Sequence, residues 1–203
     1  MEHWLSADLK ESSFLILRYD LDQIKETLQS LITKKRYQHS LRVADASSRL
    51  ATHYNYDTNK AYLAGLIHDA AKDLDPFTSD IPLSDFQKSL YENFTPVAHA
   101  FALSSVVDRY FFNIPEDIIQ SAQWHTTGKE NMTLLEKIVF VADFIEPERP
   151  YSERNTVEDL AFESLDKAVG YIAWFKLNYL VNSRQPIYLK LLDCYNFYNK
   201  NSE

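Results

Sequence analysis

The chain has one cysteine among its 203 residues, so no disulfide within the chain can stabilise the fold. This cysteine, Cys194, lies in an apolar helical pattern, where a small buried side chain is its ordinary role. A lone thiol suits a reducing compartment, and the N-terminal apolar run is too short for a secretory core. We therefore expect a cytoplasmic protein. Only three glycines and seven prolines are present, which disfavours a β architecture with many turns.

Long apolar runs and an excess of positive charge are also absent. No stretch approaches the roughly 20 apolar residues of a membrane-spanning helix, so no membrane partner is expected. The chain carries 21 basic and 29 acidic residues, for a net charge of −8. This balance disfavours an extended nucleic-acid-binding surface. It still allows a local cationic pocket.

What is present is helical periodicity along nearly the whole chain. Cap-forming residues and apolar positions at spacings of three and four predict the helices. Their expected ranges are 20 to about 34, 37–51, 57–68, 84–93, 97–110, 113 to about 125, 133–143, 156 to about 182 and 188–198. The segment between 73 and 82 is rich in proline, serine and aspartate and is expected to be a loop. We predict one all-α domain over residues 20–203, after an N-terminal extension (1–19) of unknown role.

His68 and Asp69 stand side by side at the end of an apolar helical run, residues 61–67. A buried unpaired carboxylate costs several kcal/mol, so buried carboxylates are paired, protonated or bound to a metal. Metal binding becomes the leading interpretation because other potential ligands also lie beside apolar helical patterns. These are His39, His99, His125 and Asp143. Imidazole suits transition metals, and the long spacings require ligands that converge from different helices of a bundle.

The helix before this pair contains small residues, Ala61, Ala64 and Gly65, which allow another helix to approach closely. Gly65 costs about 1 kcal/mol of helix propensity relative to alanine. We therefore expect a packing reason for Gly65.

The ordered pattern of these ligands resembles the HD-domain phosphohydrolases, and His99 and His125 resemble the additions found in the two-metal subset. Three longer motifs, residues 68–73, 124–128 and 142–149, together resemble the YqeK family of symmetrical bis(5′-nucleosyl)-tetraphosphatases. The resemblance extends from about residue 20 to the C-terminus. It implies a single HD-domain helical bundle with a buried two-metal site, an HD core at about 35–150 and C-terminal helices at 156–200.

The resemblance also implies an activity and a ligand set. The activity is metal-dependent hydrolysis of diadenosine tetraphosphate to two ADP, by water or hydroxide activated by two metals, iron or alternatively manganese. One metal would be bound by His39, His68, Asp69 and Asp143, and the other by Asp69, His99 and His125, with Asp69 bridging. Two divalent cations outweigh two aspartates in charge, so such a site could bind a polyphosphate although the chain is acidic.

The motifs imply further site residues. Those expected to bind substrate are Lys72, His99, His125, Thr126, Thr127, Gly128 and Arg149, and those expected to act in catalysis are Asp69, Lys72 and Asp73. Lys72 offers a point charge and Arg149 a bidentate fork for phosphate. Asp73 could orient Lys72 or assist proton transfer. The chain departs from the family at Ala100-Phe101, where a run of small residues is usual, which leaves the local pocket shape open.

Several alternatives stay open. Lys72 could form a surface ion pair with Asp73, and Arg149 could pair with a neighbouring acid. The aromatic residues Trp174, Phe175 and Tyr179 are expected in core or interface packing, with nucleobase stacking as a minority interpretation. Aromatic residues in and beside the last helix are expected either to cover an apolar face or to form the contact of a possible homodimer; they are Tyr188, Tyr195, Phe197 and Tyr198. The alternative functions are hydrolysis of another nucleotide, such as a mononucleotide, by an HD phosphohydrolase, and nucleotide binding by a non-catalytic regulatory module.

Overall fold

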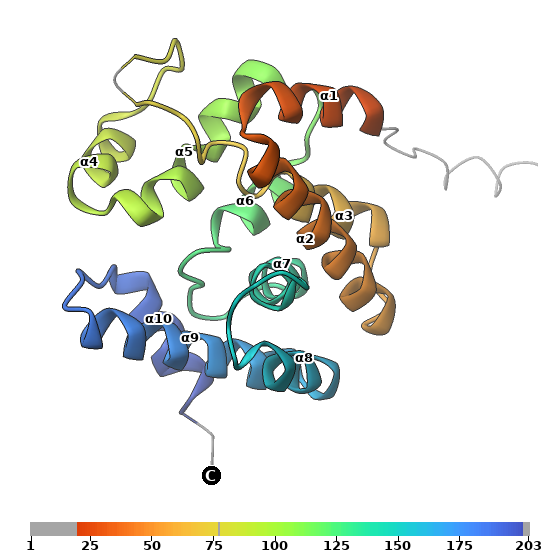
Figure 1. Ribbon diagram of the computed structural model, residues 1–203, viewed down its shortest axis with the longest axis vertical. Helices are drawn as coiled ribbons and strands as arrows, with labels where there is room; N and C mark the ends of the chain where they lie inside the picture. Colours follow the sequence, from red (N-terminus) through yellow and green to blue (C-terminus); the bar gives the residue numbers. More distant parts are fainter. Residues whose placement is uncertain (1–19, 77, 201–203) are drawn as a thin grey trace, which may run out of the picture.

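Figure 1 shows the computed structural model, which describes residues 20–76 and 78–200. Within these ranges the regular structure consists of ten helices and no strand, which confirms the all-α prediction. The helices are α1 (Leu21–Leu31), α2 (Lys34–His53), α3 (Thr58–Ile67), α4 (Asp85–Asn93), α5 (Thr95–Tyr110), α6 (Glu116–Gln123), α7 (Leu134–Ile145), α8 (Arg154–Glu163), α9 (Leu165–Asn182) and α10 (Leu189–Tyr198). No helix in the described ranges is long and apolar enough to cross a bilayer. The predicted N-terminal extension lies outside the described residues.

Side-chain caps explain where many of these helices begin. Asp20, Asp57 and Thr133 accept hydrogen bonds from backbone N–H groups in the first turns of α1, α3 and α7. Ser84 and Thr133 each form a reciprocal capping box with the residue three positions later. Thr33 caps α2, so α1 ends at Leu31, a little before the predicted end. Local chemistry thus sets these helix starts.

The prediction of one long helix from 156 to about 182 was wrong. Two helices, α8 and α9, cover this region, and they are separated at Ser164. Ser164 is extended (φ −159°, ψ 118°); its N–H donates to Leu160 O, and its side chain accepts from Lys167 N. The serine therefore ends one helix and caps the next, although the apolar periodicity continues on both sides of it.

Helix α7 lies at the centre of the fold and is seen nearly end-on in Figure 1. It contacts α2, α3, α6, α8 and α9. Residues 138–146 are buried without interruption, as expected for a helix that is apolar on all sides. Asp143 is an exception to this apolar character, so α7 carries a carboxylate into the interior of the protein.

Gly65 has the packing reason that the sequence predicted. A Cβ at this position would lie 2.6 Å from Ser47 Oγ, 2.9 Å from Ala44 Cα and 3.0 Å from Val43 O on α2. Two of these three atoms belong to the backbone and can move only if the helices separate. The α2–α3 contact therefore depends on the absence of a side chain at residue 65.

We expect Gly65→Ala to destabilise the protein by about 1–3 kcal/mol, because overpacking outweighs the gain in helix propensity. Urea unfolding should show a lower midpoint for the variant. Asn59→Ala is the matched control, since Asn59 is exposed on the same helix and gains propensity without a clash. Equal stability of Gly65→Ala and Asn59→Ala would contradict the close approach.

Candidate metal centre

Six predicted ligands come together in the interior, from five segments of the chain. His39 lies on α2, His68 and Asp69 follow α3, His99 lies on α5, His125 follows α6, and Asp143 lies on α7. Each of these residues is at most 8% exposed. The fold thus gathers potential ligands that are up to about a hundred positions apart in sequence.

The first group consists of His39, His68, Asp143 and one oxygen of Asp69. Asp143 Oδ1 lies 3.1 Å from His39 Nε2 and 3.6 Å from His68 Nε2. Asp69 Oδ2 lies 3.8 Å from His39 Nε2 and 3.6 Å from His68 Nε2. Neighbouring ligands bound at about 2.1 Å to one ion are separated by roughly 3 Å or somewhat more. His39, His68 and Asp69 are therefore spaced to share one metal ion, and Asp143 Oδ1 lies beside both histidines of that group.

The second group consists of His99, His125 and the other oxygen of Asp69. Asp69 Oδ1 lies 3.2 Å from His99 Nε2 and 3.4 Å from His125 Nε2. The two histidine Nε2 atoms are 3.1 Å apart. The two oxygens of Asp69 therefore face different groups, which is the arrangement of a carboxylate that bridges two cations.

Outer hydrogen bonds orient three of the histidines. Each has its Nδ1 beside an acceptor: Glu146 Oε1 for His39 at 3.1 Å, Gly65 O for His68 at 2.6 Å and Ala122 O for His125 at 2.6 Å. An Nδ1–H donor leaves the Nε2 lone pair free for a metal. His68 Nε2 is buried and has no hydrogen-bond partner. Because buried polar atoms are normally satisfied, this atom fits a metal that completes its coordination.

At His68, His99 and Asp69 the environment favours the protonation states that bind metals. Burial lowers the pKa of His68 to about 3 and that of His99 to about 4, so both rings are neutral at pH 7. Burial raises the pKa of Asp69, but the surrounding histidines lower it by more, and His68 has the largest lowering effect. The pKa of Asp69 therefore lies well below its usual range. Neutral imidazole and ionised carboxylate are the forms that coordinate cations.

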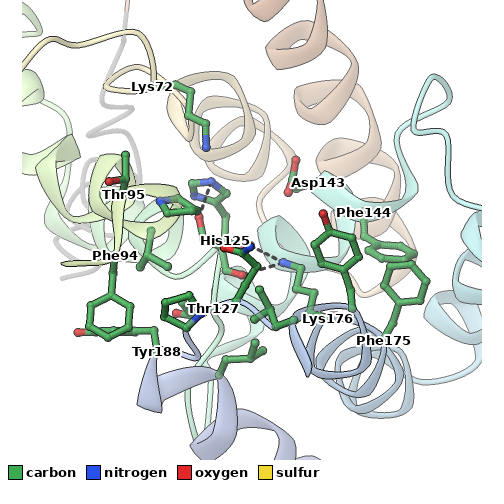
Figure 2. Close-up of a pocket in the computed structure, with 18 of the residues that line it drawn as sticks. Lys72, Phe94, Thr95, His125, Thr127, Asp143, Phe144, Phe175, Lys176 and Tyr188 are labelled. Carbon is green, nitrogen blue, oxygen red and sulfur yellow. Dashed lines mark hydrogen bonds between the residues drawn. The ribbon is translucent and has the colours of Figure 1, made fainter. Parts of the chain in front are cut away.

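A cavity of about 830 Å³ opens over these ligands. Asp69, His125 and Asp143 form part of its lining, and Figure 2 shows Lys72, His125, Asp143 and Lys176 around its centre. Its lining includes four cationic side chains: Arg36, Lys72, Arg149 and Lys176. These four cations outnumber the two lining carboxylates, so an acidic protein presents a locally positive cavity that suits an anionic ligand.

Comparison with known proteins identifies the fold family. Residues 36–148 match the HD domain, which is more than half of the chain. A symmetrical bis(5′-nucleosyl)-tetraphosphatase from Staphylococcus aureus is 31% identical over 188 residues, which cover 91% of this chain and 97% of the relative. The chain belongs to the HD-domain family, and within it to the symmetrical bis(5′-nucleosyl)-tetraphosphatases. The predicted family is confirmed.

Two further comparisons agree with this assignment. A relative from Halalkalibacterium halodurans, also named a symmetrical bis(5′-nucleosyl)-tetraphosphatase, is 34% identical and covers 81% of this chain and 89% of its own. A solved structure from Clostridium acetobutylicum, described as an HD superfamily hydrolase involved in NAD metabolism, superposes with a TM-score of 0.76. It is 29% identical and covers 91% of this chain and 99% of its own. The chain is thus an HD-domain hydrolase, and its buried histidine–aspartate groups suggest binding of divalent metals.

Lys72 and Asp73 of this HD-domain hydrolase point to different partners. Lys72 Nζ lies 3.1 Å from His99 Nδ1, inside the cavity. Asp73 Oδ2 accepts a hydrogen bond of 2.7 Å from Thr33 N, at the junction of α1 and α2. The structure thus gives Asp73 a structural partner, and its predicted part in catalysis stays a prediction.

Arg149 contacts the ligand cluster directly. It forms an ion pair with the Asp143 carboxylate, and its Nε donates to Asp143 O at 2.7 Å. The neighbouring acid considered for Arg149 is thus the potential metal ligand itself. Arg149 also lines the cavity, and its predicted contact with phosphate stays a prediction.

The segment after His125 contributes to the site in two ways. Thr126 Oγ1 lies 3.0 Å from His125 Nε2, and both Thr126 and Thr127 line the cavity. Gly128 has φ +61°, and a Cβ there would lie 2.6 Å from Cys194 Sγ. The positive φ and the contact with Cys194 therefore explain why a glycine occupies position 128. The predicted approach of Gly128 to substrate remains a prediction.

Three residues at the site did not enter the sequence prediction. Glu146 accepts from His39, Arg36 Nη1 donates to Asp69 Oδ2 at 2.8 Å, and Lys176 Nζ donates to Thr126 O at 2.8 Å. Burial lowers the pKa of Lys176 to about 8. Two signals in the sequence could have indicated these residues: the spacing from a predicted ligand and the presence of a charge in an apolar run. Glu146 and Arg36 each lie three residues from a predicted ligand, and Lys176 interrupts an apolar run.

Proposed function

We propose that this HD-domain hydrolase cleaves dinucleoside tetraphosphates symmetrically, with diadenosine tetraphosphate as its substrate and two ADP as products. The observation that carries the proposal is the position of Asp69, whose two oxygens face two separate histidine groups beneath a cavity with four cationic lining residues. The names of the relatives in Staphylococcus aureus and Halalkalibacterium halodurans support this substrate class.

The proposed cofactors are two divalent metals, iron or alternatively manganese. His39, His68, Asp69 and Asp143 would hold one of them, and Asp69, His99 and His125 the other. When bound, such a pair polarises a phosphate and can lower the pKa of bound water to about 7 in favourable cases, which makes hydroxide available for attack on an inner phosphorus. The buried Nε2 of His68, which has no other partner, supports the first site.

The remaining site residues would bind and orient the phosphate chain. Lys72 and Arg149 line the cavity beside the ligands and would neutralise phosphate charge, the arginine through two parallel N–H groups. The Thr126 hydroxyl would donate to a phosphate oxygen next to His125. Attack on one inner phosphorus would break its bond to the central bridging oxygen, and that oxygen would depart as part of the second ADP.

Product analysis tests the proposal. Anaerobically purified protein with added iron or manganese should convert diadenosine tetraphosphate to ADP alone, as resolved by chromatography. Release of inorganic phosphate from a mononucleotide, without ADP from the dinucleotide, would favour the alternative nucleotidase. A protein that binds no metal and hydrolyses neither substrate would be the non-catalytic module, and the enzyme proposal would fail.

We expect Lys72→Ala to lower kcat/KM about 10- to 100-fold while metal content stays unchanged, because a phosphate contact is lost but no metal ligand is removed. Steady-state kinetics and elemental analysis measure the two quantities. Lys88→Ala is the control, since Lys88 is exposed on α4 and does not line the cavity. Loss of metal in Lys72→Ala would mean that this lysine supports His99 rather than the substrate.

Some expectations from the sequence remain proposals. We propose a cytoplasmic location, a possible homodimer and no nucleic-acid partner. We also retain the division into an HD core at about 35–150 and C-terminal helices at 156–200.

A further inference from the structure

We infer that the cavity has two separate nucleoside-binding walls, one on each side of the ligand cluster, so that a dinucleoside polyphosphate is held at both ends. This inference rests on the proposed function and deepens it. The cavity volume, about 830 Å³, lies in the upper part of the range of roughly 300–1,000 Å³ for small-molecule sites. A phosphate chain alone does not explain its extensive aromatic lining.

The first wall, here called the α5–α10 wall, is built from Phe94, Val97 and Tyr188. Phe94 precedes α5 and Tyr188 precedes α10, and their half-buried rings meet at 5.3 Å in an edge arrangement. The buried ring of Phe101 supports Tyr188 from behind at 5.6 Å and packs against Trp124 at 5.4 Å. Phe101, the bulky departure from the family pattern, thus belongs to the foundation of this wall.

The second wall, here called the α7–α9 wall, is built from Tyr151, Phe175 and Tyr179. The buried ring of Phe144 stacks behind Tyr151, with centroids 4.7 Å apart and planes 26° apart. Phe175 packs edge-on against Phe144 at 5.3 Å. Tyr179 is 65% exposed although it lines the cavity. Each wall therefore presents partly exposed rings that are backed by a buried ring.

The two walls lie on opposite sides of the cationic centre. Figure 2 shows Phe94 and Tyr188 on one side, Phe144 and Phe175 on the other, and His125 and Lys176 between them. Aromatic surfaces stack on nucleobases, whereas the central lysines suit phosphate. The lining thus follows the order base, phosphates, base, which is the order of chemical groups in a dinucleoside polyphosphate.

This order gives a physical reason for symmetrical cleavage. If both bases are held, the middle of the phosphate chain must cross the ligand cluster, and the bond at the centre is the one presented for attack. A single wall would fix the position of the cleaved bond relative to one nucleoside only. With two walls, the binding of both bases places the central bond at the ligand cluster. The central bond is therefore the one selected for cleavage.

The test compares one variant from each wall with two ligands. Tyr188→Ala and Tyr179→Ala should each raise KM for diadenosine tetraphosphate about 5- to 100-fold, the effect of losing one base–aromatic stack, with kcat within about twofold. Adenosine 5′-tetraphosphate has one nucleoside, so its inhibition constant should rise in at most one of the two variants. Tyr188→Phe keeps the ring and should retain the KM of the parent protein. Phe112→Ala removes a ring that is 76% exposed and does not line the cavity, so its KM should also be unchanged.

Several results would overturn the inference. One is a KM for the dinucleotide that responds to only one wall. Another is an equal rise of the inhibition constant in both alanine variants, since both rings would then contact the same nucleoside. Thermal unfolding of each variant separates lost binding from lost folding, and Tyr179 is exposed enough for its removal to spare the core. Normal ADP release with unaltered KM in both variants would refute the walls alone. A parent protein that releases no ADP would refute the proposed function, and the walls with it.

Discussion

Asp69→Ala is expected to abolish turnover and to remove both metals from the protein. The two oxygens of Asp69 lie 3.2–3.8 Å from the Nε2 atoms of four histidines, two on each side. Removing this side chain deletes a ligand from both groups and leaves Asp143 as the only carboxylate among the proposed ligands. We expect kcat to fall by at least about a thousandfold, because the groups of such a centre act as a unit. Elemental analysis should find well under one metal per chain.

Two further variants make this result specific. Asp69→Asn keeps the size of the side chain but removes its charge, so it should fold and still lose most of its metal. Asp45→Ala removes an exposed carboxylate from α2, the helix that carries His39, and should keep both metals and full activity. Two metals per chain in Asp69→Ala would contradict the bridging role.

Glu146→Gln is expected to have the second largest effect, although Glu146 is no metal ligand in our proposal. Its buried carboxylate accepts from His39 Nδ1 at 3.1 Å and from Arg42 Nε at 2.6 Å. Burial raises the pKa of Glu146, but hydrogen bonds from His39 and Arg42 lower it more, to about 2. The charged carboxylate therefore holds the His39 ring with Nε2 toward the cluster. Loss of such an outer partner typically costs 10- to 100-fold in metal affinity or activity.

The loss in Glu146→Gln should be confined to the metal bound by His39. Activity titrated against added metal should shift to about 10- to 100-fold higher concentration, and dialysed protein should retain the metal at His99 and His125. Glu148→Gln is a matched control, because Glu148 pairs with the same arginine, Arg42, at 3.1 Å but has no contact to His39 among those described. An equal shift in Glu148→Gln would assign the effect to Arg42 instead.

Helices and ligand types were predictable because they depend on local chemistry. Asp57 and Thr133 cap the helices that the sequence assigned to them, and Gly65 is explained by the approach of α2. The break at Ser164 was not predicted, because apolar periodicity persists across it and one serine hydroxyl decides the interruption. A polar residue inside a continuing pattern is thus the local signal that periodicity alone overlooks.

The sequence by itself determined that the protein is helical, which histidines and aspartates it buries, and to which family its motifs belong. Only the tertiary structure decided how Asp69 divides its oxygens, that Glu146 holds His39 across 107 positions of sequence, and that aromatic walls from α5, α7, α9 and α10 face one cavity. The physical reason is that helix formation is governed by neighbours along the chain. The distances between distant side chains are set instead by how whole helices pack around α7.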